Sequence, residues 1–179
     1  DGFIVTVLGS DESCRHRIAK VVDDGQCTFQ VGNVIALPFA DNSFDVVISF
    51  RLLTHCEQWP VLVKELCRVA RQAVIVDYPT SQSLNVIAPM LFKAKKSFEK
   101  NTRTWRLFRH NEVGEAFHEN GFTQRSRKAQ FFLPMVLHRA IKSRRVSAAL
   151  ESIPRAHPLP ERRGSPVIVK MAPGVNKQG

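Results

Sequence analysis

The sequence predicts an α/β fold with a doubly wound, mostly parallel sheet. Short apolar runs alternate along the chain with segments of helical periodicity, which is typical of strand–helix–strand units. Several of these runs are almost continuously apolar, as in strands that are buried on both faces. The chain has 179 residues, which is long enough to bury a substantial core. We therefore expect one domain, 1–179, with residues 1–80 and 81–179 as its two halves.

The first half of the chain predicts four strands and two helices. The polar residues 10–13 follow the first apolar run and are suited to begin a helix. Pro60 stands at the start of the second helix, whose apolar residues lie on one face. The expected strands are Phe3–Gly9, Cys27–Gly32, Phe44–Phe50 and Ala73–Asp77, and the expected helices are Cys14–Val22 and Pro60–Arg71.

The stretch Cys27–His55 decides how the first half is organised. Its two apolar runs are joined by a short polar loop, so a simple hairpin is one interpretation. The strand–helix rhythm on both sides favours two parallel strands instead. Polar and turn-forming residues follow each run, and ligands of such sheets bind at the carboxyl ends of the strands.

The second half has a looser pattern, with a helix closed by Gly121 as its clearest feature. Three prolines between residues 154 and 160 indicate a loop. The expected helices are Ser81–Lys100, Asn111–Asn120 and a basic one near Val136–Leu150, and the expected strands are Phe122 to about Phe132 and Pro166–Met171.

Charge is distributed unevenly over the two halves. The net charge of the whole chain is +10. Residues 1–90 carry 7 Lys and Arg against 10 Asp and Glu, a net of −3, whereas residues 91–179 carry 19 against 6, a net of +13. The basic half indicates either an anionic partner, such as nucleic acid, acidic lipid headgroups or an acidic substrate, or simply a solvated basic surface.

The cysteines and the apolar runs favour a cytoplasmic protein. Cys27, Cys56 and Cys67 lie within apolar patterns and are expected to be small core residues. The four cysteines show neither C-x-x-C spacing nor a paired set of histidines, so we predict no metal site. The sequence has no apolar run near the roughly 20 residues of a membrane span and no signal-peptide pattern.

The segment 31–55, VGNVIALPFADNSFDVVISFRLLTH, resembles the class I S-adenosylmethionine-dependent methyltransferases. The most similar subgroup contains quinone-biosynthesis C-methyltransferases and many small-molecule methylases. The resemblance covers residues 3–80 well and 109–123 moderately. Its motifs are Gly32-Asn33, Leu37-Pro38-Phe39, Asp41-Asn42-Ser43-Phe44-Asp45, Leu53-Thr54-His55 and Glu65-Leu66-Cys67-Arg68-Val69. The resemblance implies a Rossmann-like fold and S-adenosyl-L-methionine as the cofactor.

The resemblance also assigns a cofactor site in the first half of the chain. Asp11, with Glu12 as the alternate, corresponds to the acidic residue that binds the ribose hydroxyls, although Asp11 is also placed to cap the next helix. Asn33 stands where the family usually has the Asp that reads the adenine amino group, and its alternative role is that of a turn residue. Val34 or Ile35 would contact the adenine ring. Phe50, directly after the next strand, belongs to the same site.

Two further residues are candidates for the reaction itself. His55 is the candidate general base, although a structural hydrogen bond is an alternative and methyl transfer often needs only alignment of the reactants. Tyr78 follows a strand and either lines the substrate site or packs in the core. The expected acceptor is a small or lipid-like molecule. A nucleic-acid-binding protein or RNA methyltransferase that uses the basic half, or an inactive methyltransferase fragment, is the alternative.

One family motif has no counterpart in the sequence. The family carries a Gly-rich loop after its first strand, and its position falls upstream of Asp1. That first strand is central in the family's sheet, between the second and fourth strands. We therefore expect an N-terminally truncated domain, in which the strands Phe3–Gly9 and Phe44–Phe50 face a gap with unpaired edges.

Overall fold

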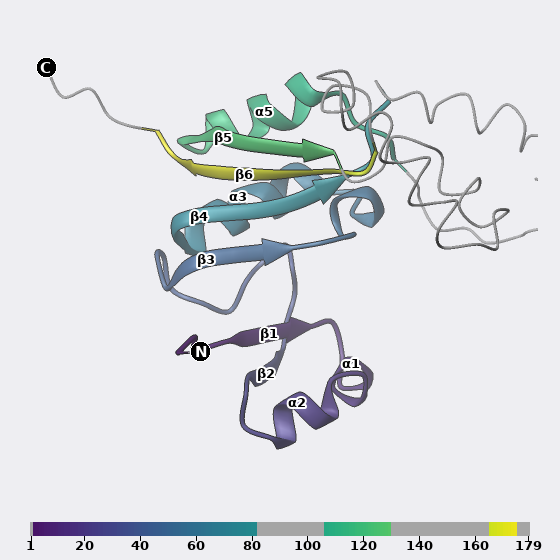
Figure 1. Ribbon diagram of the computed structural model, residues 1–179, viewed down its shortest axis with the longest axis vertical. Coiled ribbons are helices and arrows are strands. Elements are labelled where there is room, and N and C mark those ends of the chain that lie inside the picture. The colour runs from purple at the N-terminus through teal and green to yellow at the C-terminus, as the bar shows by residue number, and fades with distance from the viewer. Residues whose placement is uncertain (1, 82–105, 130–164, 175–179) are drawn as a thin grey trace, which may run out of the picture.

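The strands that the structure describes form two separate sheets. A computed structural model describes residues 2–81, 106–129 and 165–174 (Figure 1). The smaller sheet pairs β1 (Thr6–Gly9) with β2 (Thr28–Val31) in parallel. The larger sheet has the order β3-β4-β6-β5, with β3 parallel to β4 and β6 antiparallel to both β4 and β5. Its strands are β3 (Phe44–Ser49), β4 (Ala70–Tyr78), β5 (Phe122–Ala129) and β6 (Val167–Pro173).

One face of the larger sheet carries the core. Alternate residues of a strand share a face, and Val74, Val76 and Tyr78 of β4 all belong to the same buried cluster. The helices α3 (Trp59–Val69) and α5 (His110–Glu119) cover this face with the apolar sides that their sequence periodicity predicted. Other members of the cluster are Leu53, Leu62, Val63, Leu66, Phe108, Val113, Phe117, Val167, Val169 and Met171.

The opposite face of the larger sheet is exposed along β3. Val46 and Ile48 of β3 retain 45% and 61% of their accessible surface. The prediction that this strand is buried on both faces is therefore wrong for the part of the chain that the structure describes. The reason is that a continuous apolar run reports what a strand can bury, whereas burial depends on which elements lie over it.

The first predicted strand is also shorter and less buried than expected. β1 begins at Thr6, and Phe3 and Ile4 are 85% and 98% exposed. On the side away from β2, β1 has no neighbouring strand among the described residues, because no ladder joins β1 to β3. The expected gap between the first strand and Phe44–Phe50 is therefore confirmed. In Figure 1, β1 and β3 point in the same direction on either side of it.

The connections between strands agree with a doubly wound arrangement. β2 and β3 lie in different sheets, so the hairpin interpretation of residues 27–55 does not hold. The first predicted helix is interrupted near Arg17 and consists of two short helices, α1 (Ser13–His16) and α2 (Ala19–Asp23). A short 3-10 turn, η1 (Leu53–His55), precedes α3. Gly121, with φ of +78°, follows the end of α5 as predicted, since glycine adopts this conformation without strain.

The remaining expectations concern the cysteines, the helices of the second half and a membrane span. Cys67 is buried, whereas Cys27 and Cys56 are only partly buried, so the prediction of core cysteines is confirmed for Cys67 alone. The helix expected at 136–150 and all but the first residue of the helix expected at 81–100 lie outside the described residues. No helix within residues 2–81, 106–129 and 165–174 is long and apolar enough to cross a membrane.

Candidate functional site at the carboxyl ends of the strands

The predicted site residues lie at or just beyond the carboxyl ends of β1, β2, β3 and β4. Parallel strands end at the same edge of a sheet, so Asp11 and Asn33 follow neighbouring strand ends in the smaller sheet. In the larger sheet, Phe50 follows β3 and Tyr78 is the last residue of β4. The arrows of β1, β3 and β4 point the same way in Figure 1, and β2 is parallel to β1. The candidate site is therefore shared between two sheets that no backbone ladder connects among the described residues.

Asp11 is ionised and accessible, but its side chain already caps the start of α1. Its Oδ1 accepts a hydrogen bond from the backbone N–H of Ser13 at 2.9 Å and another from the Ser13 hydroxyl, and Oδ2 accepts one from the Ser10 hydroxyl at 2.9 Å. The hydrogen bonds from Ser13, with that from Ser10, lower the pKa of the Asp11 carboxyl. The capping role is thus present in the structure. A carboxylate has about four acceptor sites, so it retains capacity for a further donor.

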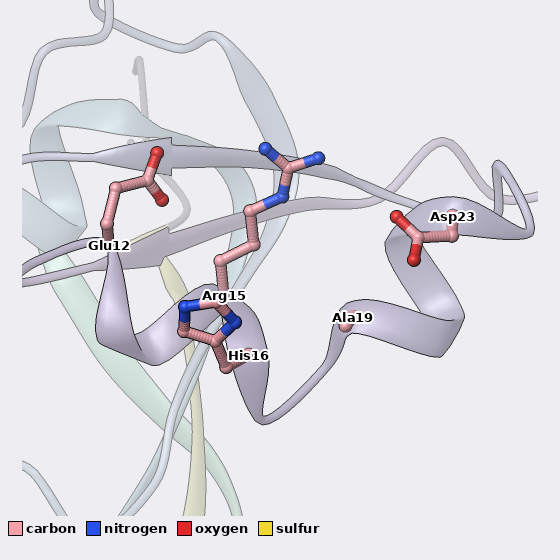
Figure 2. Close-up of a pocket in the computed structure, with 5 residues that line it drawn as sticks. All are labelled: Glu12, Arg15, His16, Ala19 and Asp23. Atoms are coloured by element: carbon pink, nitrogen blue, oxygen red, sulfur yellow. The ribbon is translucent and has the colours of Figure 1, made fainter.

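Glu12 lies apart from the other predicted residues. It lines a surface hollow of about 340 Å³ together with Arg15, His16, Ala19 and Asp23 (Figure 2). The side chains of Glu12 and Asp23 lie at opposite ends of this hollow, with Arg15 and His16 between them. The hollow belongs to α1, α2 and their flanks, and no other predicted cofactor residue lines it.

The loop after β2 places Asn33 in a local turn. Its side-chain Oδ1 accepts a hydrogen bond from the backbone N–H of Ile35 at 3.0 Å, and its backbone oxygen accepts one from Ala36 at 3.2 Å. This is the turn role that the sequence left open. Val34 and Ile35 are half-buried and pack against the main core, so each has one side committed to the fold.

Arg68 and Glu65 of α3 hold the next part of this loop. Arg68 donates hydrogen bonds to the backbone oxygens of Leu37 and Phe39, at 3.0 and 2.8 Å, and to the carboxylate of Asp41 at 2.7 Å. Glu65 accepts from the backbone N–H of Leu37 at 2.7 Å. Sequence reasoning identified these residues only as part of a motif. The i,i+3 spacing of Glu65 and Arg68, with the acidic Asp41 upstream, was the sequence signal that could have indicated an ion-pair network here.

A buried carboxylate organises the segment after β3. Asp77, which is 7% exposed, accepts a hydrogen bond from the backbone N–H of Arg51 at 2.5 Å. Arg51 has φ of +58°, a conformation that residues with a side chain adopt at a cost. Phe50 precedes this turn and is half-exposed. Asp77 stands at the end of a strand, where site residues are expected, but no role was predicted for it.

Tyr78 is buried and paired. Its hydroxyl lies 2.9 Å from Nδ1 of His110, and its ring meets that of Phe108 edge-on. Burial raises the pKa of Tyr78 to about 12. Burial, followed by the charge of Arg127, lowers the pKa of His110, so both groups are uncharged near neutral pH. The structure thus shows the packing role of Tyr78. His55 is exposed at the end of η1.

The comparisons with known proteins find similarity to methyltransferases. Residues 4–76 match the family model described as a methyltransferase domain. An alignment over 90 residues shows 28% identity to norajmaline N-methyltransferase of Rauvolfia serpentina. It covers 45% of this chain and 31% of that protein. The chain therefore spans about a third of this curated relative.

Solved structures share the fold at low sequence identity. Magnesium protoporphyrin IX methyltransferase of Synechocystis PCC 6803, solved with bound SAH, matches with a TM-score of 0.63 and 13% identity, over 97% of this chain and 65% of that one. A SAM-dependent methyltransferase of Thermotoga maritima, described as a possible histamine N-methyltransferase, matches with a TM-score of 0.59 and 17% identity, over 94% and 72%. This chain has the class I methyltransferase fold.

The break between the sheets lies where the resemblance places a further strand. The first strand of this fold lies between the second and fourth, which is the place between β1 and β3 where no ladder forms among the described residues. The methyltransferase fold does not by itself fix the reaction. The cyclase SpnF has it too, with a TM-score of 0.62 and 14% identity over 98% of this chain and 67% of that one.

Proposed function

We propose that this chain binds S-adenosyl-L-methionine and takes part in methyl transfer to a small or lipid-like molecule. The observation that carries the proposal is that Asp11 and Asn33 each come two residues after the paired ends of two parallel strands, Gly9 and Val31. There an ionised carboxylate suits a ribose diol, and an amide oxygen suits the amino group of adenine. The match of residues 4–76 to the methyltransferase domain model supports the same assignment.

The described residues fit the adenosine part of this cofactor better than its methionine part. Methionine binding in this fold uses a Gly-rich loop that leaves open space beside the backbone. A Cβ atom added at Gly9 would lie 2.7 Å from Cys14 and from Phe29, and one at Gly32 would lie 2.9 Å from Leu8. The chain's own side chains therefore fill the space beside these two glycines. Asp11, Asn33 and Phe50 are the residues that we assign to the adenosine part.

The chain's residues contribute mainly by binding and orientation. When bound, the cofactor supplies an electrophilic methyl group on its sulfonium. Asp11 and Asn33 would fix the adenosine, and the exposed ring of Phe50 would contact it from the larger sheet. Val34 and Ile35 would offer their remaining apolar surface to the adenine. Alignment of this kind accounts for much of the acceleration of a displacement reaction.

His55 and Tyr78 are the candidates on the acceptor side. His55 is exposed after β3, where an acceptor can reach it, and we propose it as the base that takes a proton from the acceptor. Tyr78 is buried against Phe108 and would support the wall of the acceptor site rather than exchange protons. The names of the relatives, norajmaline, magnesium protoporphyrin IX and histamine methyltransferases, are those of small-molecule enzymes and support a small acceptor.

The proposal also includes an anionic partner for the basic half, residues 91–179, and a cytoplasmic location. The net charge of +13 in residues 91–179 suits an anionic acceptor or surface. The four cysteines are free thiols, which supports a reducing, cytoplasmic setting.

Calorimetric titration of the full chain with SAH tests cofactor binding. We expect saturable heat with the unchanged chain and about tenfold weaker binding for Asp11→Asn, which keeps an acceptor for Ser13 but removes the charge. Asp24→Asn, at an exposed position after α2, is the matched control and should bind like the unchanged chain. Absence of heat and of any thermal shift with the unchanged chain would overturn the proposal.

A further inference from the structure

We propose that Arg68 and Glu65 are positioning residues that hold the 33–41 loop, and with it the two sheets, in the arrangement that the cofactor needs. This inference rests on the function proposed above and deepens it. It concerns how a site divided between two sheets is kept together.

Arg68 uses its whole guanidinium group on this task. Nη1 reaches the backbone oxygen of Phe39 and the carboxylate of Asp41, and Nη2 reaches the backbone oxygen of Leu37. Nε and Nη2 also bind Glu65, at 2.9 and 2.8 Å. A planar group with five fixed donors can satisfy acceptors in several directions at once, and a lysine ammonium cannot reproduce this geometry.

Glu65 and the backbone of α3 complete the attachment. Glu65 is only 14% exposed in its side chain and accepts from the backbone N–H of Leu37. The hydrogen bond from Arg68 is the main reason that the pKa of Glu65 is lowered, so the carboxylate stays charged. The backbone oxygen of Arg68 accepts from Asn42 at 2.9 Å. The end of α3 thus binds the loop at Leu37, Phe39, Asp41 and Asn42.

The attached loop contacts both sheets. On one side, Val34, Ile35 and Leu37 pack against the core of the larger sheet. On the other side, Pro38 crowds Gly32 at the end of β2, where an added Cβ would lie 3.0 Å from the proline ring and 2.9 Å from Leu8 of β1. No strand ladder connects the sheets among the described residues. The loop and its attachment to α3 therefore fix where Asp11 and Asn33 stand relative to Phe50.

The test compares Arg68→Lys with Arg71→Lys in the full chain. Arg71 also binds a carboxylate, with Nε 3.0 Å from Asp45, and among the described residues its side chain makes no hydrogen bond to the loop. We expect Arg68→Lys to weaken SAH binding about tenfold or more, because three loop contacts lose their geometry, whereas Arg71→Lys should bind like the unchanged chain. Glu65→Gln keeps an acceptor for the backbone N–H of Leu37 but removes the charge. This variant replaces Arg68→Lys if Arg68→Lys does not fold, and it should weaken SAH binding less than Arg68→Lys does.

Hydrogen exchange separates positioning from general stability. In Arg68→Lys, the amides of Leu37 and Asn42 should exchange faster, while those of β4 and β6 should keep their protection. Equal SAH affinity in Arg68→Lys and Arg71→Lys overturns the inference, as does uniform loss of protection across the larger sheet. If the unchanged chain binds no SAH, the proposed function is overturned instead, and the exchange comparison alone decides whether the pair holds the loop.

Discussion

Asp77 accepts a hydrogen bond from the backbone of Arg51, and this contact joins the carboxyl ends of β4 and β3. The carboxylate is almost fully buried, and the residue that it binds has a left-handed backbone conformation. The turn after β3 is therefore held by a side chain from the neighbouring strand. Phe50, which belongs to the candidate cofactor site, immediately precedes this turn.

Removal of the Asp77 carboxylate is expected to destabilise the protein. Asp77→Ala leaves the Arg51 N–H without its partner in a partly buried place, and we expect a loss of about 1–3 kcal/mol in the free energy of unfolding. Asp77→Asn retains an acceptor and should lose less. Urea denaturation measures both variants, and Asp24→Ala at an exposed position serves as the control. Equal stability of Asp77→Ala and the control would show that the contact contributes nothing.

Ser49 and Thr54 are expected to respond in opposite ways to loss of the hydroxyl. The Ser49 hydroxyl is buried and has no hydrogen-bond partner among the described residues, so Ser49→Ala should be neutral or stabilising. Thr54 donates to the backbone oxygen of Arg106 at 2.7 Å, and Thr54→Val should cost about 1 kcal/mol. Thermal unfolding compares the two. A destabilised Ser49→Ala variant would indicate that the hydroxyl has a partner.

The pair of Tyr78 and His110 is expected to make stability depend on pH. The pKa of His110 is lowered in the folded state, so the unfolded chain binds a proton more readily as the pH falls. Stability is therefore complete above the unfolded value of about 6.5 and is lost as the pH falls from there through the lower folded value. Denaturation midpoints measured at steps of about one pH unit between pH 8 and pH 5 should fall less steeply for His110→Asn than for the unchanged chain. Parallel profiles would contradict the assignment.

The exposed face of β3 is expected to bind hydrophobic probes. Val46 and Ile48 lie on one face and are largely exposed, so the double variant Val46→Thr, Ile48→Thr should bind less of an apolar dye. Its free energy of unfolding should change by about 0.5 kcal/mol or less, as for surface substitutions. Val74→Thr, in the buried core, is the contrasting variant and should be clearly destabilised. If the double variant binds as much dye as the unchanged chain, the dye binds an apolar surface other than this face of β3, and the prediction is wrong.

The sequence predicted the type and order of elements well where periodicity is local. The segments around residues 44–50, 60–71, 73–77 and 111–120 form strands and helices close to the predicted limits. The position of the family's first strand, upstream of Asp1, predicted unpaired edges between Phe3–Gly9 and Phe44–Phe50, and no ladder joins β1 to β3 among the described residues. Burial was predicted less well, because the exposed side chains of β3 depend on what lies over the sheet and not on their own pattern.

The candidate site was predicted as a set of residues but not as a set of contacts. Asp11 and Asn33 follow the strands as expected, yet each side chain already has a local hydrogen-bond partner that the sequence offered only as an alternative. Their roles in cofactor binding stay predictions, as do those of Glu12, His55 and Tyr78.

The sequence by itself determined the strand–helix rhythm and the positions of the polar segments that follow the strands. These features depend on residues that are near one another in the chain, where periodicity and turn chemistry act directly. Only the tertiary structure decided that Arg68 reaches Leu37 and that Asp77 holds Arg51, because these partners lie 31 and 26 positions apart. Such contacts arise when the elements pack together, and no local pattern specifies them.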